Sequence, residues 1–157
     1  MKLDENFFDK NHSEMFNTLR ILHYPKSNEK IKAGIHSDYG SITLLFQDDI
    51  GGLEILKKDK WISINNPNES KETFPIIINS GDLMEIWTNK KYPSVKHRVM
   101  GTKKNEIQSR YSIAYFCHPD KNCEIETVKS CLSENGKSNF SKVNSFQYLL
   151  DKLNNSY

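Results

Sequence analysis

The chain has 157 residues, enough for one domain with a substantial core and too few for two. Its formal net charge is only +2, so it lacks the strong positive field that would indicate nucleic acid or an anionic membrane as a partner. No apolar stretch is long enough to cross a bilayer, and the first residues lack the apolar segment of a secretion signal. We therefore expect a soluble cytoplasmic protein.

The cysteines agree with that expected location. Cys117, Cys123 and Cys131 are odd in number and lack CxxC spacing. They fit reduced, partly buried thiols better than a disulfide framework or a zinc site.

Short apolar segments, separated by turns rich in Gly, Asn, Asp and Pro, make up most of the chain. They predict many short strands, which indicates a β-sandwich or jelly roll. A short amphipathic helix is predicted within residues 3–17, and apolar residues at helical spacing predict a closing helix over about 140–154. Residues 101–109 are predicted as a polar hairpin loop and 120–139 as irregular chain. The predicted strands cover residues 18–25, 34–40, 41–47, 53–56, 61–64, 75–79, 83–87, 94–99 and 110–116.

His36 and Asp38 are the first candidate site residues. They stand two positions apart in an extended stretch, so their side chains should project to the same side. A second histidine from a later strand, His97, would complete a facial His-Asp-His triad, the ligand set of non-haem Fe(II) oxygenases. A His-x-Asp tripeptide alone is common, and Asp38 before Tyr-Gly also fits a simple turn residue. The assignment therefore depends on the rest of the chain.

Further segments follow these residues in a consistent order. His36-Ser37-Asp38 is followed by residues 41–48, 51–55 and 78–89, then by 94–99 around His97 and 110–114 with Arg110-x-Ser112. Together they resemble the isopenicillin N synthase-like group of 2-oxoglutarate- and Fe(II)-dependent dioxygenases, from about Leu3 to the end of the chain. The resemblance implies a mainly β fold, with a double-stranded β-helix (jelly roll) core, a short N-terminal helix and a C-terminal helix.

The resemblance also implies how the site is divided between iron and cosubstrate. His36, Asp38 and His97 would hold Fe(II) on one face, leaving positions for the C1 carboxylate and ketone of 2-oxoglutarate and for O₂. The reaction that it implies oxidises an unidentified small molecule by hydroxylation, desaturation or cyclisation, with release of succinate and CO₂.

Three further residues would bind the far end of 2-oxoglutarate. By resemblance, Arg110 and Ser112 anchor its C5 carboxylate, Arg110 through a charge-assisted hydrogen bond and Ser112 through its hydroxyl. Tyr24 matches the tyrosine that often donates to the same carboxylate.

Other prominent side chains fit structural roles. Arg98 alternates to the face opposite His97, and Asp82 after Gly81 fits a turn residue. Trp61 and Trp87 are expected to pack the sheets. The remaining histidines lack partners at ligand spacing and are expected to lie on the surface or in the core: His12, His23 and His118.

Members of the family that the chain resembles are usually about twice as long. We expect residues 1–157 to form one catalytic domain with its core at about 18–120, without the usual N-terminal domain. The missing cover would expose a sheet edge and apolar surface, which favours self-association or a partner protein over that region. Two alternatives stay open: a related iron oxidase that does not use 2-oxoglutarate, and a truncated jelly-roll remnant without activity.

Overall fold

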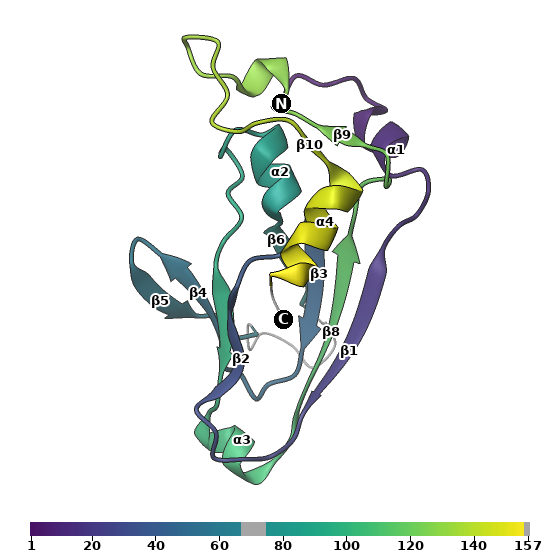
Figure 1. The fold of residues 1–157 in the computed structure, drawn as a ribbon. Coiled ribbons are helices and arrows are strands. Elements are labelled where there is room, and N and C mark those ends of the chain that lie inside the picture. Colours follow the sequence, from purple (N-terminus) through teal and green to yellow (C-terminus); the bar gives the residue numbers. More distant parts are fainter. Residues whose placement is uncertain (67–74, 156–157) are drawn as a thin grey trace.

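Two four-stranded antiparallel sheets form the body of the protein in a computed structural model that describes residues 1–66 and 75–155 (Figure 1). This arrangement confirms the predicted mainly β jelly-roll fold. The first sheet has the order β1 (Thr18–Tyr24), β8 (Arg110–Cys117), β3 (Ile42–Gln47), β6 (Ile77–Ser80). The second has the order β2 (Ile31–His36), β7 (His97–Met100), β4 (Leu53–Lys57), β5 (Lys60–Ser63).

Short helices and a small two-stranded sheet lie at the two ends of this body. In Figure 1, α2, α4 and the β9–β10 pair gather toward one end, while α3 lies at the other. Among the described residues, no helix is both long and apolar enough to cross a membrane. These elements are α1 (Phe7–Asn11), α2 (Asp82–Trp87), α3 (Lys103–Ile107), β9 (Glu124–Ile125), the 3₁₀-helix η1 (Lys129–Cys131), β10 (Val143–Asn144) and α4 (Ser145–Asn154).

The predicted strand at residues 83–87 is wrong, because this segment is helix α2. Four of its five residues are apolar, and so short a run fits both the two-residue period of a strand and the 3.6-residue period of a helix. The structure buries Leu83, Ile86 and Trp87, which stand at the i, i+3, i+4 spacing of one helix face. The short apolar run therefore belongs to a buried helix.

Two other sequence predictions also change. The N-terminal helix covers only residues 7–11 of the predicted 3–17. The predicted hairpin loop at 101–109 contains α3, because the Thr102 side chain accepts a hydrogen bond from the backbone N–H of Asn105 and caps the helix. Both are single short turns of helix, whose ends a hydrophobic pattern locates poorly.

The hydrophobic core of the helical end forms around Trp87. Its indole is 2% exposed and meets the rings of Phe7 and Phe8 edge-on, with centroids 5.5 and 5.8 Å away. Trp87 therefore joins α1 to α2, in a core cluster that includes Ile125 of β9 and has Ile42 of β3 packed against it. Trp61 instead lies beneath the guanidinium of Arg98, whose Cζ is 4.0 Å from the centre of the tryptophan ring.

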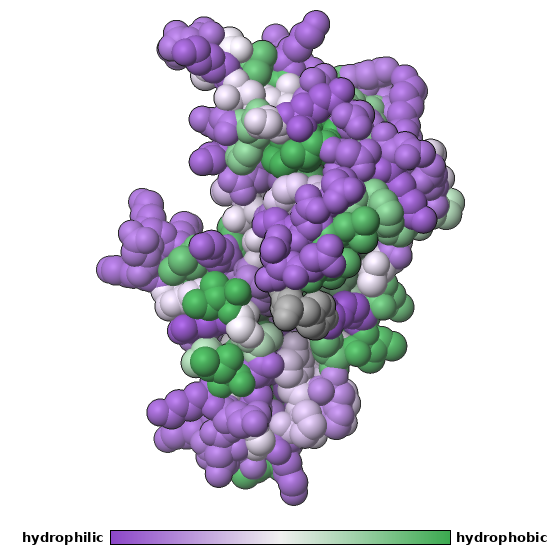
Figure 2. Space-filling view, viewed as in Figure 1, coloured by the Kyte–Doolittle hydropathy of each residue, from purple (hydrophilic) through white to green (hydrophobic). Residues whose placement is uncertain are grey.

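The outward face of the first sheet is apolar and largely uncovered by the described chain. Ile21 on β1 is 75% exposed and pairs in register with Ile113 on β8, which also pairs with Phe46 on β3. Figure 2 shows apolar surface along the right-hand edge, where Figure 1 places β1. We call the exposed apolar residues of this sheet face the outer patch, which comprises Leu19, Ile21, Phe46, Ile78, Tyr111 and Ile113.

We predict that Trp87→Ala lowers the free energy of unfolding by about 3–5 kcal/mol, because it removes a large buried side chain and leaves a cavity between α1 and α2. Urea titration followed by circular dichroism would measure the change. Trp61→Ala is the matched control, and it should cost less because Trp61 is only half-buried. An equal loss in both variants would contradict the central place of Trp87 in the core.

Candidate metal centre

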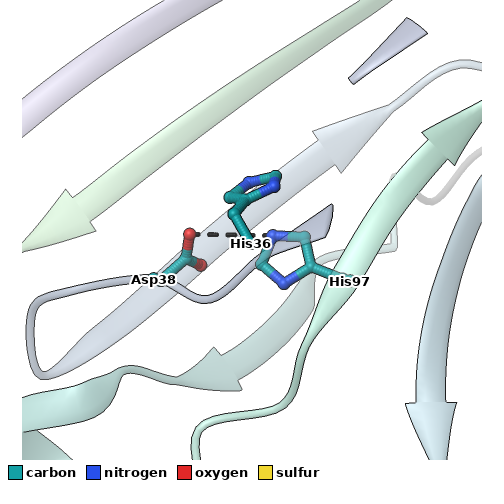
Figure 3. Close-up of side chains that lie close together, drawn as sticks. All are labelled: His36, Asp38 and His97. Atoms are coloured by element: carbon teal, nitrogen blue, oxygen red, sulfur yellow. Dashed lines mark ion pairs between the residues drawn. The ribbon is translucent and has the colours of Figure 1, made fainter. Parts of the chain in front are cut away.

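Three side chains converge where β2 ends and β7 begins. His36 is the last residue of β2, His97 is the first of β7, and the two pair across the sheet with ring centroids 4.2 Å apart. Asp38 lies in the loop after β2, and its Oδ1 is 3.7 Å from Nε2 of His97. One ligand atom from each residue lies within 4.8 Å of the others, and all three side chains point toward one another in Figure 3.

The backbone fixes which nitrogen of each histidine can bind a cation. Nδ1 of His36 lies 2.8 Å from the carbonyl oxygen of Gly34, and Nδ1 of His97 lies 3.1 Å from that of Val95. A carbonyl only accepts, so Nδ1 must carry the hydrogen in both rings. Each neutral imidazole is then left with its lone pair on Nε2. Hydrogen bonds of this kind orient metal-binding histidines.

Asp38 is held by contacts on both its side chain and its backbone. Nδ2 of Asn79, on β6, donates a 2.7 Å hydrogen bond to Oδ2, which leaves Oδ1 toward the histidines. The carbonyl of Asp38 accepts a 2.8 Å hydrogen bond from the backbone N–H of Asp82 at the start of α2. The carboxylate is 6% exposed, so its orientation is set by the protein and not by solvent.

Two glycines allow this loop to lie directly on α2. A Cβ on Gly81 would stand 2.3 Å from the carbonyl oxygen of Gly40, and one on Gly40 would stand 2.3 Å from that of Cys117. Side chains at these positions would push the backbones apart. Both glycines therefore support the position of the neighbouring Asp38.

Asp82 is a buried anchor and not the simple turn residue that the sequence suggested. Its Oδ2 forms a 2.8 Å ion pair with Lys152 and accepts a 3.0 Å hydrogen bond from the Tyr148 hydroxyl, both on α4. Burial alone would raise the pKa of Asp82, but Lys152, Ser94 and Tyr148 together hold that pKa below its ordinary value. Burial and the Asp82 charge raise the pKa of Tyr148 to about 12, which keeps the hydroxyl protonated as the donor.

The triad opens on a cavity of about 650 Å³ between the two sheets. Most of its walls are apolar, with Leu22 and Leu45 from the first sheet and Leu53 and Val99 from the second. All six residues named from the sequence line this one cavity: Tyr24, His36, Asp38, His97, Arg110 and Ser112.

Arg110 is 2% exposed and held from several sides. Its Nε donates to the Gly51 carbonyl at 2.9 Å, one terminal nitrogen to Gln47 Oε1 at 2.8 Å and the other to Ser112 Oγ at 3.3 Å. Its Cζ lies 4.9 Å from the centre of the Tyr24 ring. Burial lowers the pKa of Arg110, while Tyr24 and Asp48 act in the opposite direction. A guanidinium has five N–H groups, so these three bonds leave one on each terminal nitrogen.

The residues that the sequence assigned to structural roles stay outside the triad. Arg98 pairs with Glu54 at 2.8 Å on the other side of β7 from His97. His12 bonds the Ser41 hydroxyl, His23 stacks on Tyr111, and burial lowers the pKa of His118.

Sequence reasoning missed the residues that orient the ligands. Asn79 fixes Asp38, and Gln47 fixes Arg110, yet neither received a role beforehand. A usable signal was present for Asn79, because an amide in an otherwise apolar strand needs a partner when it faces a core.

The donor set fits a divalent transition-metal ion. Two imidazole nitrogens and one carboxylate oxygen, all presented from one side, match the facial triad of non-haem Fe(II) sites. The imidazole of His97 is half-buried and that of His36 is exposed, and both rings line the cavity. A metal ion bound by the triad would therefore face the cavity.

Known proteins resemble this chain throughout its length. The family model for the 2OG-Fe(II) oxygenase superfamily matches residues 15–119. The 2-oxoglutarate-dependent dioxygenase htyE of Aspergillus rugulosus is 33% identical, covering 100% of this chain and 51% of the relative. The proline hydroxylase buaE of Petromyces alliaceus is 32% identical, covering 100% and 52%. The chain thus spans about half the length of these relatives.

A solved structure shows the same likeness in three dimensions. A full-length Neurospora crassa protein, crystallised in complex with alpha-KG and thymine, superposes with a TM-score of 0.86 at 37% identity. The match covers 99% of this chain and 49% of that chain.

We predict that Asn79→Ala weakens binding of Fe(II) about 10- to 100-fold, because Asp38 would lose the hydrogen bond that orients its carboxylate. Anaerobic calorimetric titration with Fe(II) would measure the affinity. Asn28→Ala, at an exposed turn, is the control and should bind as the wild type does. Unchanged affinity in Asn79→Ala would show that Asp38 keeps its geometry without this partner.

Proposed function

Because the chain belongs to the 2OG-Fe(II) oxygenase superfamily, we propose that its residues 18–120 form a catalytic core that oxidises a small organic molecule. The proposed cosubstrates are O₂ and 2-oxoglutarate, and the products include succinate and CO₂. The observation that carries the proposal is the convergence of His36, Asp38 and His97 on a cavity that also contains a buried arginine.

The proposed metal ligands are Nε2 of His36, Nε2 of His97 and Oδ1 of Asp38. Fe(II) with bound 2-oxoglutarate would supply the oxidising chemistry. The Nδ1 hydrogen bonds of both imidazoles direct Nε2 away from the backbone, and Asn79 restrains the carboxylate. The apolar walls would exclude water around the reacting atoms.

Arg110 is the proposed anchor for the distal carboxylate of 2-oxoglutarate. Its planar guanidinium suits a carboxylate, and the Ser112 hydroxyl can donate to the same group while it accepts from Arg110. Tyr24 faces the guanidinium across the pair of strands, since the two residues are in register. These contacts would fix the length and direction of the cosubstrate in the cavity.

The same contacts favour 2-oxoglutarate over the alternative of an iron oxidase without it. A buried guanidinium that lines the cavity favours an anion beside it, because its burial disfavours its charge. The dicarboxylate would supply one carboxylate here while its other end reaches the metal ligands. The second alternative, a remnant without activity, is not favoured by a ligand set whose orienting hydrogen bonds are all in place.

We also propose an intracellular site of action. Cys117, Cys123 and Cys131 are free thiols. Burial raises the pKa of Cys117, and burial with the charges of Asp120 and Glu124 raises that of Cys123 to about 11. Such thiols are poorly reactive and suit a reducing compartment.

The outer patch is the proposed contact for a second copy of this chain or for a partner that covers the first sheet. Its exposed Leu, Ile, Phe and Tyr side chains cross four neighbouring strands. Contiguous apolar surface of this kind favours association in water.

We predict that anaerobic addition of Fe(II) and then 2-oxoglutarate produces the weak visible charge-transfer band of an iron chelate. The band should be absent in His36→Ala, because one metal ligand is lost. In Arg110→Ala it should require a much higher 2-oxoglutarate concentration, because the distal carboxylate loses its charged partner.

The outcomes separate the alternatives. Iron binding without the band would favour the oxidase that does not use 2-oxoglutarate. A folded chain that binds no iron would rule out the catalytic proposal for these 157 residues.

We further predict that the chain self-associates with rising concentration, and that Ile21→Lys reverses this by placing a charge in the outer patch. Sedimentation velocity over a concentration series would measure the association. Ile107→Lys is the matched control, since Ile107 is 78% exposed on α3 and is not part of the outer patch. A monomeric wild type at every concentration would contradict association through this face.

A further inference from the structure

The register of the first sheet orders the side chains along one wall of the cavity. Asn79 pairs with Thr43, which pairs with Phe116, which pairs with Thr18. This row lies at the metal end, because Asn79 bonds Asp38. Two residues further along each strand, on the same face of the sheet, the next row contains Ile77, Leu45, Ala114 and Arg20. The paired residues Arg110 and Tyr24 lie further from the metal end, because Tyr24 is four residues beyond Arg20 along β1.

Arg20 therefore lies on the metal side of Arg110. Residues 20, 22 and 24 of β1 share one face, and Arg20, Leu22 and Tyr24 all line the cavity. The Cα atoms of Arg20 and Tyr24 are separated by about 13 Å at the usual rise of a strand. The two arginines thus serve different parts of the same cavity.

The guanidinium of Arg20 has no hydrogen-bonding or ionic partner among residues 1–66 and 75–155. The lysine and the other arginine that line the cavity have partners, since Lys32 on β2 contacts the Ser27 hydroxyl and Arg110 is bound by Gln47, Gly51 and Ser112. Arg20 is exposed and lines the cavity from β1. That strand is at the edge of the first sheet (Figure 1). A ligand in the cavity can reach it without displacing an existing contact.

The chemistry of the surrounding wall defines what such a ligand must contain. Leu22, Leu45, Ile77 and Ala114 surround Arg20 with apolar surface. A planar fork of N–H donors in these surroundings matches a carboxylate on an otherwise apolar molecule.

We propose that Arg20 is a specificity-determining residue that binds a carboxylate of the organic substrate, and that the substrate is an apolar carboxylic acid. This proposal rests on the proposed function, since Arg110 is taken to hold 2-oxoglutarate. The substrate carboxylate would lie at Arg20 and its apolar part would extend toward the triad.

Calorimetric titration with matched acids and amides tests the proposal. The probes are phenylacetate with phenylacetamide, and hexanoate with hexanamide, each added to the wild type, Arg20→Gln, Arg20→Lys and Arg110→Gln. The wild type should bind at least one acid more tightly than its amide. Arg20→Gln should weaken the acid about 30-fold or more and leave the amide nearly unchanged. Arg20→Lys should keep part of the preference.

The Arg110→Gln variant assigns the effect to one arginine. A preference for the acid that persists in Arg110→Gln and disappears in Arg20→Gln would support the proposal. No preference in the wild type, or a preference that persists in Arg20→Gln, would overturn it.

The iron chelate band separates this proposal from the proposed function. Arg20→Gln should form the band at the 2-oxoglutarate concentration that the wild type needs, which also shows that the variant is folded. A wild type without the band would refute the proposed function, while the calorimetric preference for acids would still decide the role of Arg20.

Discussion

Burial of the Asp38 carboxylate is the constraint on which the rest of the site depends. An anionic group that is 6% exposed is costly unless hydrogen bonds and positive charge compensate it. Asn79 supplies one hydrogen bond, and the paired histidines leave room for a cation beside the remaining oxygen. This requires β6, β2 and β7 to meet at one point, which only the two-sheet arrangement achieves.

The strands and the triad could be predicted from the sequence because their signals are local or recur in order. The HxD spacing places His36 and Asp38 on one side, and the strand around His97 is clearly bounded by turns. The identity of α2 could not be predicted, because a five-residue apolar run fits strand and helix alike. The close contact of Gly81 with Gly40, just before α2, is a tertiary feature that the run itself does not indicate.

The orienting residues were also beyond a single sequence, for a related reason. Gln47 and Asn79 act across strands that lie far from Arg110 and Asp38 in the chain, so only the register reveals them. The register also separates Arg20 from Arg110, since Arg110 pairs with Tyr24, four residues from Arg20 along β1.

The contact between α4 and Asp82 links two elements that lie far apart in the sequence. Lys152 and Tyr148 hold the side chain of Asp82, whose backbone N–H holds the loop of Asp38. The ribosome makes α4 after every other described element. During synthesis, the loop that carries the carboxylate therefore remains without this support until α4 has emerged from the ribosome.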